Sequence, residues 1–541
     1  MHTANNNRKL SPHAANDLKV CASVGGMVGK MFAKVNGMGL YGMNAFPVTA
    51  EISTTPGNVP AFEIVGLADA SVQESRMRIR SALKNSEIGT KPFNTVVNLA
   101  PASVRKTGSL YDLTILTAVL ASYDLIKINI DDCAFFGEVS LGGDVNPVHG
   151  ALTLTIAARE HGIKKIFLPA ANAKEAAVTE GMAVYGVNNI RELANHLMNL
   201  KTIEPHETYV PAADDFREAL DFADVKGQEN VKNALEVAAA GFHNILIIGT
   251  PGTGKSMLSK RLPSILPQMS FGESLETTQI HSVAGILDAK NPLVTTRPFR
   301  NVSHTASAIG LIGGGSIPMP GEISLAHNGV LFLDELPEFD RKTLETLRQP
   351  LENGEIHITR AGGKANYPCK IMLVAAMNPC PCGNYGHPTK RCSCNERQVT
   401  NYLGKISQPV LDRIDIQIEA APVSYTEISD KAKGEPSAAV LKRVEAAREI
   451  QTRRYSGTAI KSNADIPAGM LREICALTPD ATQTLKNAFD KLGLSARAYD
   501  RILKVARTIA DLAASETIEK RHIARAVQYR SLDKKYWVKA N

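Results

Sequence analysis

The 541-residue sequence predicts an α/β protein, in which two α/β regions are followed by an all-α region. Three observations support this prediction. Short β-rich runs alternate with helical stretches from residue 32 to 187, and a glycine-rich loop lies between an apolar strand and a helix near residue 250. Helical periodicity dominates after residue 434. At about 150 residues per domain, the length allows three or four domains.

The predicted domains follow one another along the chain. Residues 1–31 are rich in Asn, Ser, Gly and Ala without periodicity, which predicts a flexible extension. An α/β domain over 32–200 precedes a linker over 201–217 that mixes Pro, charged and small residues. A second α/β domain is expected over 218–425, and a helical C-terminal domain over 426–541.

Composition limits the classes of function. Sixty-one Lys and Arg residues against 54 Asp and Glu give a net charge of only +7, so nucleic-acid binding would depend on local patches. The longest apolar runs, such as 371–377, fall short of the roughly 18 residues that a membrane helix needs. The first thirty residues show no secretory signal. We therefore expect a cytoplasmic protein with no membrane partner.

The glycine-rich loop satisfies the P-loop pattern and lies between the predicted strand 244–248 and the predicted helix 257–262. Its backbone N–H groups would bind phosphate oxygens, Lys255 would neutralise the β- and γ-phosphates, and Ser256 would ligate Mg²⁺. The sequence therefore predicts a site for ATP. Its members are Gly249, Thr250, Pro251, Gly252, Thr253, Gly254, Lys255, Ser256 and Met257.

Two further apolar runs end in polar residues that suit phosphate chemistry. The run 330–333 ends in Asp334, a second predicted Mg²⁺ site residue, and Glu335, which would act as general base toward the attacking water. The run 371–376 leads to Asn378, whose neutral amide can orient that water. An ordinary strand-end cap or turn is the alternative interpretation for each.

Cysteine is concentrated after Asn378. Cys380 and Cys382 are separated by nine residues from Cys392 and Cys394, and four thiolates on two short turns favour a structural Zn²⁺. The C-x-C spacing departs from the commoner C-x₂-C, and His387 is a substitute ligand candidate. Disulfides or free thiols remain the alternative.

The residues between these motifs contain two insertions. The unusually long stretch 281–328 contains the glycine-rich segment 310–320, whose composition favours a flexible insertion. Residues 352–368 alternate around the turn 361–363, which predicts a β-hairpin with Arg360 and Lys364 bracketing that turn. Exposed, solvated cations are one interpretation of this hairpin, and contact with a nucleic-acid backbone is the other.

The ordered motifs 249–256, 330–335, Asn378, 411–415 and 495–497 resemble those of AAA+ ATPases over residues 222–530. The resemblance implies a P-loop AAA+ core with a helical lid, a ring of identical subunits, and a hexamer in particular. It assigns Arg413 to the γ-phosphate held by a neighbouring subunit, and Arg497 to the lid, with Arg501 as the rival. The insertion and hairpin resemble pore elements of the branch containing MCM helicases and magnesium chelatases, which implies that Arg360 and Lys364 bind DNA.

Residues 32–187 resemble the Lon-protease-like (S5 domain 2-like) α/β domain of the Mg-chelatase-like ComM/YifB family. The motifs that carry this resemblance are 62–69, 74–80, 98–102 and 137–141. The register places Leu110 and Leu152 where a Lon protease has its Ser and Lys, so peptidase chemistry is not expected. Ser109 lacks an evident Lys partner. A structural or partner-binding role is expected instead, and the arginines at 76, 78 and 80 would face either DNA or water.

The family resemblance implies an ATPase and DNA motor, a helicase that promotes branch migration while incoming DNA is integrated in natural transformation. Its partners would be single- and double-stranded DNA at branched junctions. A protein-remodelling motor and a magnesium-chelatase motor subunit are the alternatives. Against the latter, the chain is longer than such a subunit and its nearest match to D-x-S-x-S, residues 69–73, fails at the last position.

Overall fold

The structure is a computed structural model that describes residues 32–56, 61–89, 93–209, 220–288, 290–360, 363–387, 389–422 and 434–537. The predicted extension over 1–31 lies outside the described residues. The chain forms two compact units. The first comprises Met1–Val210 with Gly285–Pro292, and the second comprises Pro211–Ala284 with Leu293–Asn541. The division falls within the predicted linker, and the second and third predicted domains share the second unit.

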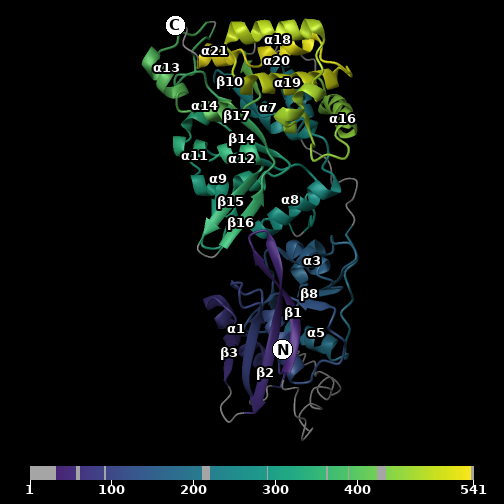
Figure 1. The fold of residues 1–541 in the computed structure, drawn as a ribbon. Coiled ribbons are helices and arrows are strands. Elements are labelled where there is room, and N and C mark those ends of the chain that lie inside the picture. Colours follow the sequence, from purple (N-terminus) through teal and green to yellow (C-terminus); the bar gives the residue numbers. More distant parts are fainter. Residues whose placement is uncertain are drawn as a thin grey trace, which may run out of the picture. The chain divides into compact units, whose positions relative to one another are not determined.

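The first unit is built on a seven-stranded mixed sheet in the order β3-β4-β2-β1-β5-β8-β9 (Figure 1). Strands β1 and β2 form an antiparallel hairpin that turns at Gly42, where φ is +60°. The strands are β1 (Phe32–Tyr41), β2 (Asn44–Pro56), β3 (Phe62–Val65), β4 (Phe93–Ala100), β5 (Cys133–Phe135), β8 (Lys165–Pro169) and β9 (Ala183–Val187). A separate two-stranded sheet joins β6 (Glu138–Val139) to β7 (Val145–Asn146).

The helices of this unit are α1 (Ala70–Asn85), α2 (Asp112–Ser122), α3 (Ala151–Glu160), α4 (Ala173–Ala176) and α5 (Ile190–Leu197). Helix α1 begins where Asp69 accepts a hydrogen bond from the Val72 N–H, an ordinary N-cap. Helix α2 is buried along nearly its whole length, and its apolar side chains pack with those of β1 and β2 in one core. The helical stretches that alternate with β-rich runs in this part of the sequence include 70–85 and 151–161, and both are confirmed, as α1 and α3.

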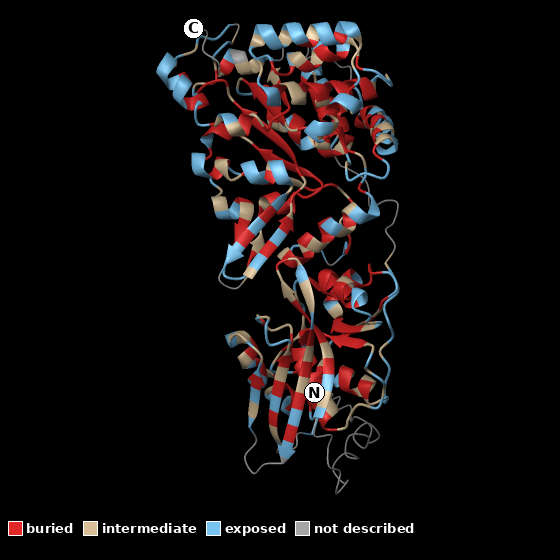
Figure 2. Cartoon of the chain, viewed as in Figure 1, coloured by how far each residue is buried: buried red, intermediate tan, exposed pale blue. Residues whose placement is uncertain are grey.

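The second unit contains a five-stranded, wholly parallel sheet in the order β11-β14-β17-β10-β18. Its strands are β10 (Ile245–Gly249), β11 (Phe299–Val302), β14 (Val330–Leu333), β17 (Met372–Met377) and β18 (Ile416–Ala420). The central strands are buried on both faces (Figure 2), which explains why they read as continuous apolar runs. The chain reverses its strand order at β10, where open parallel sheets bind their ligands.

Strand β11 is not among the elements predicted from the sequence. Its residues are Phe-Arg-Asn-Val, too short and too polar to stand out within the long stretch between the two apolar runs. Tertiary pairing creates the strand, since residues 299–302 run parallel to 330–333 in register.

Helices surround this sheet. They are α6 (Glu229–Gly241), α7 (Lys255–Arg261), α8 (Phe271–Ala284), α9 (Ala308–Ile312), α10 (Glu322–Leu325), α11 (Arg341–Glu345), α12 (Arg348–Asn353), α13 (Glu396–Leu403) and α14 (Gln408–Leu411). The helices of the described residues are too short or too polar to span a membrane.

The prediction of a flexible insertion over 310–320 was wrong. The segment follows α9 and forms a small antiparallel ladder of β12 (Gly313–Gly314) and β13 (Met319–Pro320). Glycine is needed there for close backbone approach, because a Cβ on Gly313 would lie 2.2 Å from the Met319 carbonyl oxygen. The Tyr367 hydroxyl donates to the Pro318 carbonyl at 2.6 Å, which ties this ladder to the hairpin.

The hairpin predicted within 352–368 is confirmed as β15 (Glu355–Arg360) and β16 (Gly363–Pro368), and its residues 361–362 lie outside the described part. One face, with Ile356, Ile358, Ala365 and Tyr367, is buried, and the alternate residues are exposed. Within the second unit, the hairpin lies at the end opposite the C-terminal helices (Figure 1).

The C-terminal helices are α16 (Ser437–Arg454), α17 (Leu471–Ile474), α18 (Pro479–Leu492), α19 (Ala496–Leu512), α20 (Lys520–Gln528) and α21 (Leu532–Tyr536). The helical periodicity of the sequence after residue 434 also predicts a helix over 467–477, but the structure has there only a 3-10 turn, Ala468–Met470, and the four residues of α17. Apolar residues of α6, α16 and α19 form one core with the sheet. This shared core explains why the lid and the sheet belong to one compact unit.

Candidate nucleotide and metal sites

The predicted phosphate loop connects β10 to α7, and Gly252 and Gly254 have φ values of +85° and +83°. Glycine adopts this left-handed backbone without the penalty that a Cβ would impose. The Lys255 ammonium donates to the carbonyl oxygens of Gly249 (2.8 Å) and Thr250 (3.1 Å). It also donates to Asn378 Oδ1 (3.2 Å), which comes from the end of β17. The structure thus brings Lys255 and Asn378 into direct contact.

The two predicted Mg²⁺ residues also meet. The Ser256 hydroxyl donates to Asp334 Oδ2 at 2.5 Å, joining the start of α7 to the end of β14. A hydroxyl and a carboxylate oxygen are hard ligands that suit Mg²⁺, so this donor set fits the ion. Met257, the last member of the predicted nucleotide site, is exposed on α7.

Burial lowers the pKa of Lys255, while the negative charges of Asp334 and Glu335 oppose this shift. The ammonium therefore lies in a partly desolvated place beside two carboxylates. An anionic phosphate in this loop would add further stabilisation of the charged lysine, since opposite charges interact more strongly where water is excluded.

Glu335 adopts a left-handed backbone with φ of +51°, and its Oε2 lies 3.6 Å from His304 Nδ1. His304 follows strand β11, the neighbour of the strand that ends in Asp334. His304 is not among the site residues predicted from the sequence, because the short polar strand that it follows is not predicted either. The two side chains are about half exposed, so water can reach Glu335.

Arg413 is buried within its own chain. Its guanidinium donates to the carbonyl oxygens of Arg348 (3.0 Å) and Pro409 (2.7 Å), and it forms a close ion pair with Glu352. Arg413 lines a cavity of about 600 Å³ whose other cations are Lys370, Arg497, Arg501 and Lys504. The described residues that line this cavity do not include residues 249–256. The two candidate arginines Arg413 and Arg497 therefore share a cavity distinct from the loop of the same chain.

The rival lid arginines have different surroundings. Arg497 is 66% exposed and lies 3.4 Å from Asp412, whereas Arg501 is 23% exposed and forms a close ion pair with the buried Asp415. His243 Nδ1 lies 3.2 Å from the other oxygen of Asp415. Burial acts to raise the pKa of Asp415, but the Arg501 charge and the His243 hydrogen bond hold it well below its usual range. Arg501 thus stabilises the fold through its ion pair, and Arg497 is the more available of the two to contact a nucleotide.

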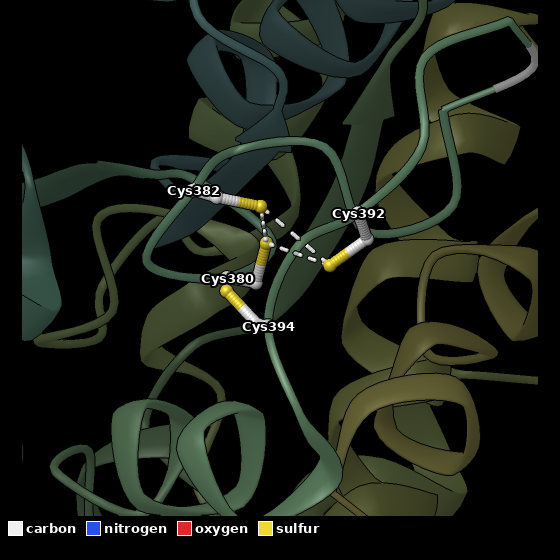
Figure 3. A group of neighbouring side chains, drawn as sticks. All are labelled: Cys380, Cys382, Cys392 and Cys394. Carbon is white, nitrogen blue, oxygen red and sulfur yellow. Dashed lines mark hydrogen bonds between the residues drawn. The ribbon is translucent and has the colours of Figure 1, made fainter.

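The four clustered cysteines converge (Figure 3), and their sulfur atoms lie within 4.8 Å of one another. Cys380 Sγ is 3.4 Å from Cys382 Sγ and 3.7 Å from Cys392 Sγ, and the last two are 3.6 Å apart. A tetrahedral ion with Zn–S bonds of about 2.3 Å spaces its ligands by roughly 3.8 Å. All four are free cysteines. The residues present therefore fit a zinc ion.

His387 is not part of this group. Its Nδ1 accepts hydrogen bonds from the backbone N–H groups of Thr389 (3.1 Å) and Lys390 (3.0 Å). The cluster found among the described residues consists of the cysteines alone. This geometry argues against His387 as a substitute ligand.

The predicted DNA-binding residues lie beside the tip of the β15–β16 hairpin. Arg360 and Lys364 are both exposed, and Arg360 Nε donates to the Gly315 carbonyl at 3.3 Å. The hairpin tip and the ladder β12–β13 are therefore neighbours, although they are separate in sequence. Lys364 presents its ammonium to solvent.

Among the described residues of the first unit, the place considered for peptidase chemistry holds no serine–lysine pair. Ser109 donates to Glu138, while the buried Lys106 donates to the Pro101 carbonyl. Leu152 is fully buried in α3. Arg78, one of the arginines considered for DNA contact, forms an ion pair with the buried Asp112 and so stabilises this unit.

The parallel sheet, the phosphate loop and the carboxylates at the end of β14 define a Mg-chelatase-like AAA+ ATPase. Family models agree along the chain: "Magnesium chelatase, subunit ChlI" matches residues 221–428, its C-terminal model matches 434–530, and "Subunit ChlI of Mg-chelatase" matches 50–172. The chain belongs to the ComM/YifB family.

Two relatives show this family. YifB of Escherichia coli is 41% identical over 499 residues, which cover 91% of this chain and 96% of the relative. Competence protein ComM of Haemophilus influenzae is 41% identical over 497 residues, with the same coverage. The magnesium-chelatase 38 kDa subunit of Cereibacter sphaeroides is 27% identical over 177 residues, which cover 29% of this chain and 52% of that subunit.

Proposed function

We propose that this protein is an ATP-driven DNA motor that assembles as a homo-hexameric ring and promotes branch migration when incoming DNA is integrated during natural transformation. The observation that carries the ATPase part is the joint placement of Lys255, Asn378, Ser256 and Asp334 around one phosphate loop. The relationship to a competence protein supports the DNA part.

In this proposal, ATP binds to residues 249–257 and Mg²⁺ is held by Ser256 and Asp334. Glu335 accepts the proton of the attacking water, and Asn378 orients that water. Arg413 would act on the nucleotide of a neighbouring subunit, because the described residues that line its cavity do not include the phosphate loop of its own chain, and Arg497 would act from the helical lid. Arginine suits this role because its forked donors match a phosphoryl group.

The proposed contact with DNA is the β15–β16 hairpin. Arg360 and Lys364 are exposed at its tip, and in a ring each cation is repeated by every subunit. Cations that neutralise backbone phosphates gain free energy from the release of counterions. A chain with a net charge of only +7 can therefore bind DNA through a few repeated positions. The four cysteines are proposed to hold Zn²⁺ as a structural ion.

Branch migration tests this proposal directly. The purified protein is incubated with ATP, Mg²⁺ and either a three-strand or a four-way DNA junction, and strand exchange is followed with time. We expect migration by the wild type, and none by Lys255→Ala or Glu335→Gln. If the wild type hydrolyses ATP but neither binds single-stranded DNA nor moves a junction, the DNA motor is rejected.

ATPase measurements with added DNA, protein or chelatase subunits distinguish the alternatives. A protein-remodelling motor would show ATPase stimulated by a protein and indifferent to DNA. A magnesium-chelatase subunit would show ATPase that responds to the other chelatase subunits, as the family matches over 221–428 and 434–530 allow.

A further inference from the structure

The loop that carries the cysteine cluster leaves the sheet beside the phosphate loop. Strands β10 and β17 are parallel neighbours, with Ile248 opposite Met377. The phosphate loop follows β10, and Asn378 followed by Cys380 continues from β17. Because parallel strands end at the same sheet edge, the two loops emerge side by side.

A direct packing contact joins the two loops. A Cβ placed on Gly383 would lie 2.5 Å from Cδ and 2.7 Å from Cγ of Pro251. Carbon atoms in contact lie about 3.5–4.0 Å apart, so only glycine fits against this proline ring. Gly383 also has φ of +79°, and its N–H donates to the Cys380 carbonyl at 3.0 Å. The turn Cys380–Gly383, which carries the first two cysteines, therefore packs against the phosphate loop.

Hydrogen bonds fix the turn that carries Cys380 and Cys382 on both sides. Upstream, Asn378 accepts a hydrogen bond from Lys255. Downstream, the buried Cys380 sulfur accepts a hydrogen bond from the Tyr385 N–H at 3.3 Å. A tetrahedral metal would further tie this turn to Cys392 and Cys394. Movement of the turn would then be transmitted to Pro251 and Asn378.

We propose that the cysteine cluster is a positioning element of the ATP site, in which Gly383 seats the metal-bound turn against Pro251 and holds the phosphate loop in its binding conformation. This inference rests on the proposed ATP and zinc sites, and it is independent of the proposed DNA substrate. It predicts that loss of the metal weakens nucleotide binding at a loop whose own residues are unchanged.

The chain offers a matched control for Gly383. Gly386 lies in the same loop and has a similar φ of +75°, but the atom nearest to a Cβ placed there is Lys535 Nζ at 3.9 Å. Gly383→Ala and Gly386→Ala therefore impose the same kind of backbone strain. The contact with Pro251 is affected in the first variant alone.

The test measures the affinity of the full-length protein for a fluorescent ATP analogue in Mg²⁺, together with bound zinc. The methyl group added by Gly383→Ala would displace Pro251 and the phosphate loop, so we expect affinity to fall about tenfold while zinc stays stoichiometric. Gly386→Ala should bind like the wild type. Pro251→Ala removes the ring atoms that the new methyl group meets, so the double variant Pro251→Ala with Gly383→Ala should regain the affinity of Pro251→Ala alone.

A second arm removes zinc with a zinc-selective chelator and then restores Mg²⁺. We expect weaker binding of the analogue, and recovery when zinc is added back. The inference is overturned if Gly383→Ala binds the analogue like the wild type with zinc retained, if Pro251→Ala gives no rescue, or if zinc-free protein binds normally. Failure to move DNA junctions, with these affinities as expected, would reject the DNA motor and leave this inference standing.

Discussion

Glu352 on α12 forms a close ion pair with Arg413, the candidate arginine finger. Helix α12 ends at Asn353, and the hairpin strand β15 begins two residues later at Glu355. Arg413 also donates to the Arg348 carbonyl on the same helix. The candidate finger is therefore connected, through one short helix, to the hairpin proposed to bind DNA.

This connection predicts the effect of Glu352→Gln. Arg413 must leave Glu352 to reach a neighbouring γ-phosphate, so removing the negative charge should raise basal ATPase about threefold, a change of well under 1 kcal/mol. DNA should then stimulate hydrolysis less than in the wild type, because Arg413 is no longer linked to α12 by this ion pair. Steady-state ATPase with and without single-stranded DNA measures the basal rate and its stimulation by DNA. Glu355→Gln, an exposed carboxylate next along the chain, is the control, and equal behaviour of the two variants would contradict the coupling.

Arg413→Ala should abolish hydrolysis while nucleotide binding and assembly persist. The loss expected for an arginine finger is at least roughly 10³-fold in kcat. Phosphate release, binding of a nucleotide analogue and size-exclusion chromatography separate the three properties. Full activity in this variant would remove the finger assignment.

The two lid arginines should behave differently. Arg497→Ala should reduce ATPase with little change in Tm, because Arg497 is exposed and its pairing with Asp412 is long. Arg501→Ala leaves the buried Asp415 without its main cation, which destabilises the fold by about 3 kcal/mol. Thermal unfolding and ATPase of both variants distinguish the roles. An unchanged Tm for Arg501→Ala would show that its ion pair is not structural.

The pH dependence of stability should reflect Asp415. Its pKa is held below the ordinary value of 3.8, so the folded state favours the ionised carboxylate. The stabilisation is complete above the unfolded pKa, near pH 4, and is lost as the pH falls through the folded pKa. The Tm difference between wild type and Asp415→Asn should therefore be constant from pH 6 to pH 5 and narrow below about pH 4. A difference that does not vary with pH would contradict the ionised state of Asp415.

Local pattern in the sequence determined much of the fold and of the nucleotide site. The phosphate loop, the acidic end of β14 and Asn378 are readable because each follows a buried strand, whose continuous apolar run is itself a sequence signal. The β15–β16 hairpin alternates with a period of two, and the cysteines are close together in sequence. These features depend on residues within a few positions of one another.

Tertiary structure decided the features that depend on distant residues. The polar strand β11 exists because it pairs with β14, and the insertion over 313–320 is ordered by its contact with Tyr367. The ion pair of Arg413 with Glu352 joins residues that are 61 positions apart in sequence. The contact of Gly383 with Pro251 joins two loops that follow neighbouring strands. Such contacts arise from packing of the sheet and its loops. No local periodicity encodes them, because burial and pairing are properties of the assembled fold.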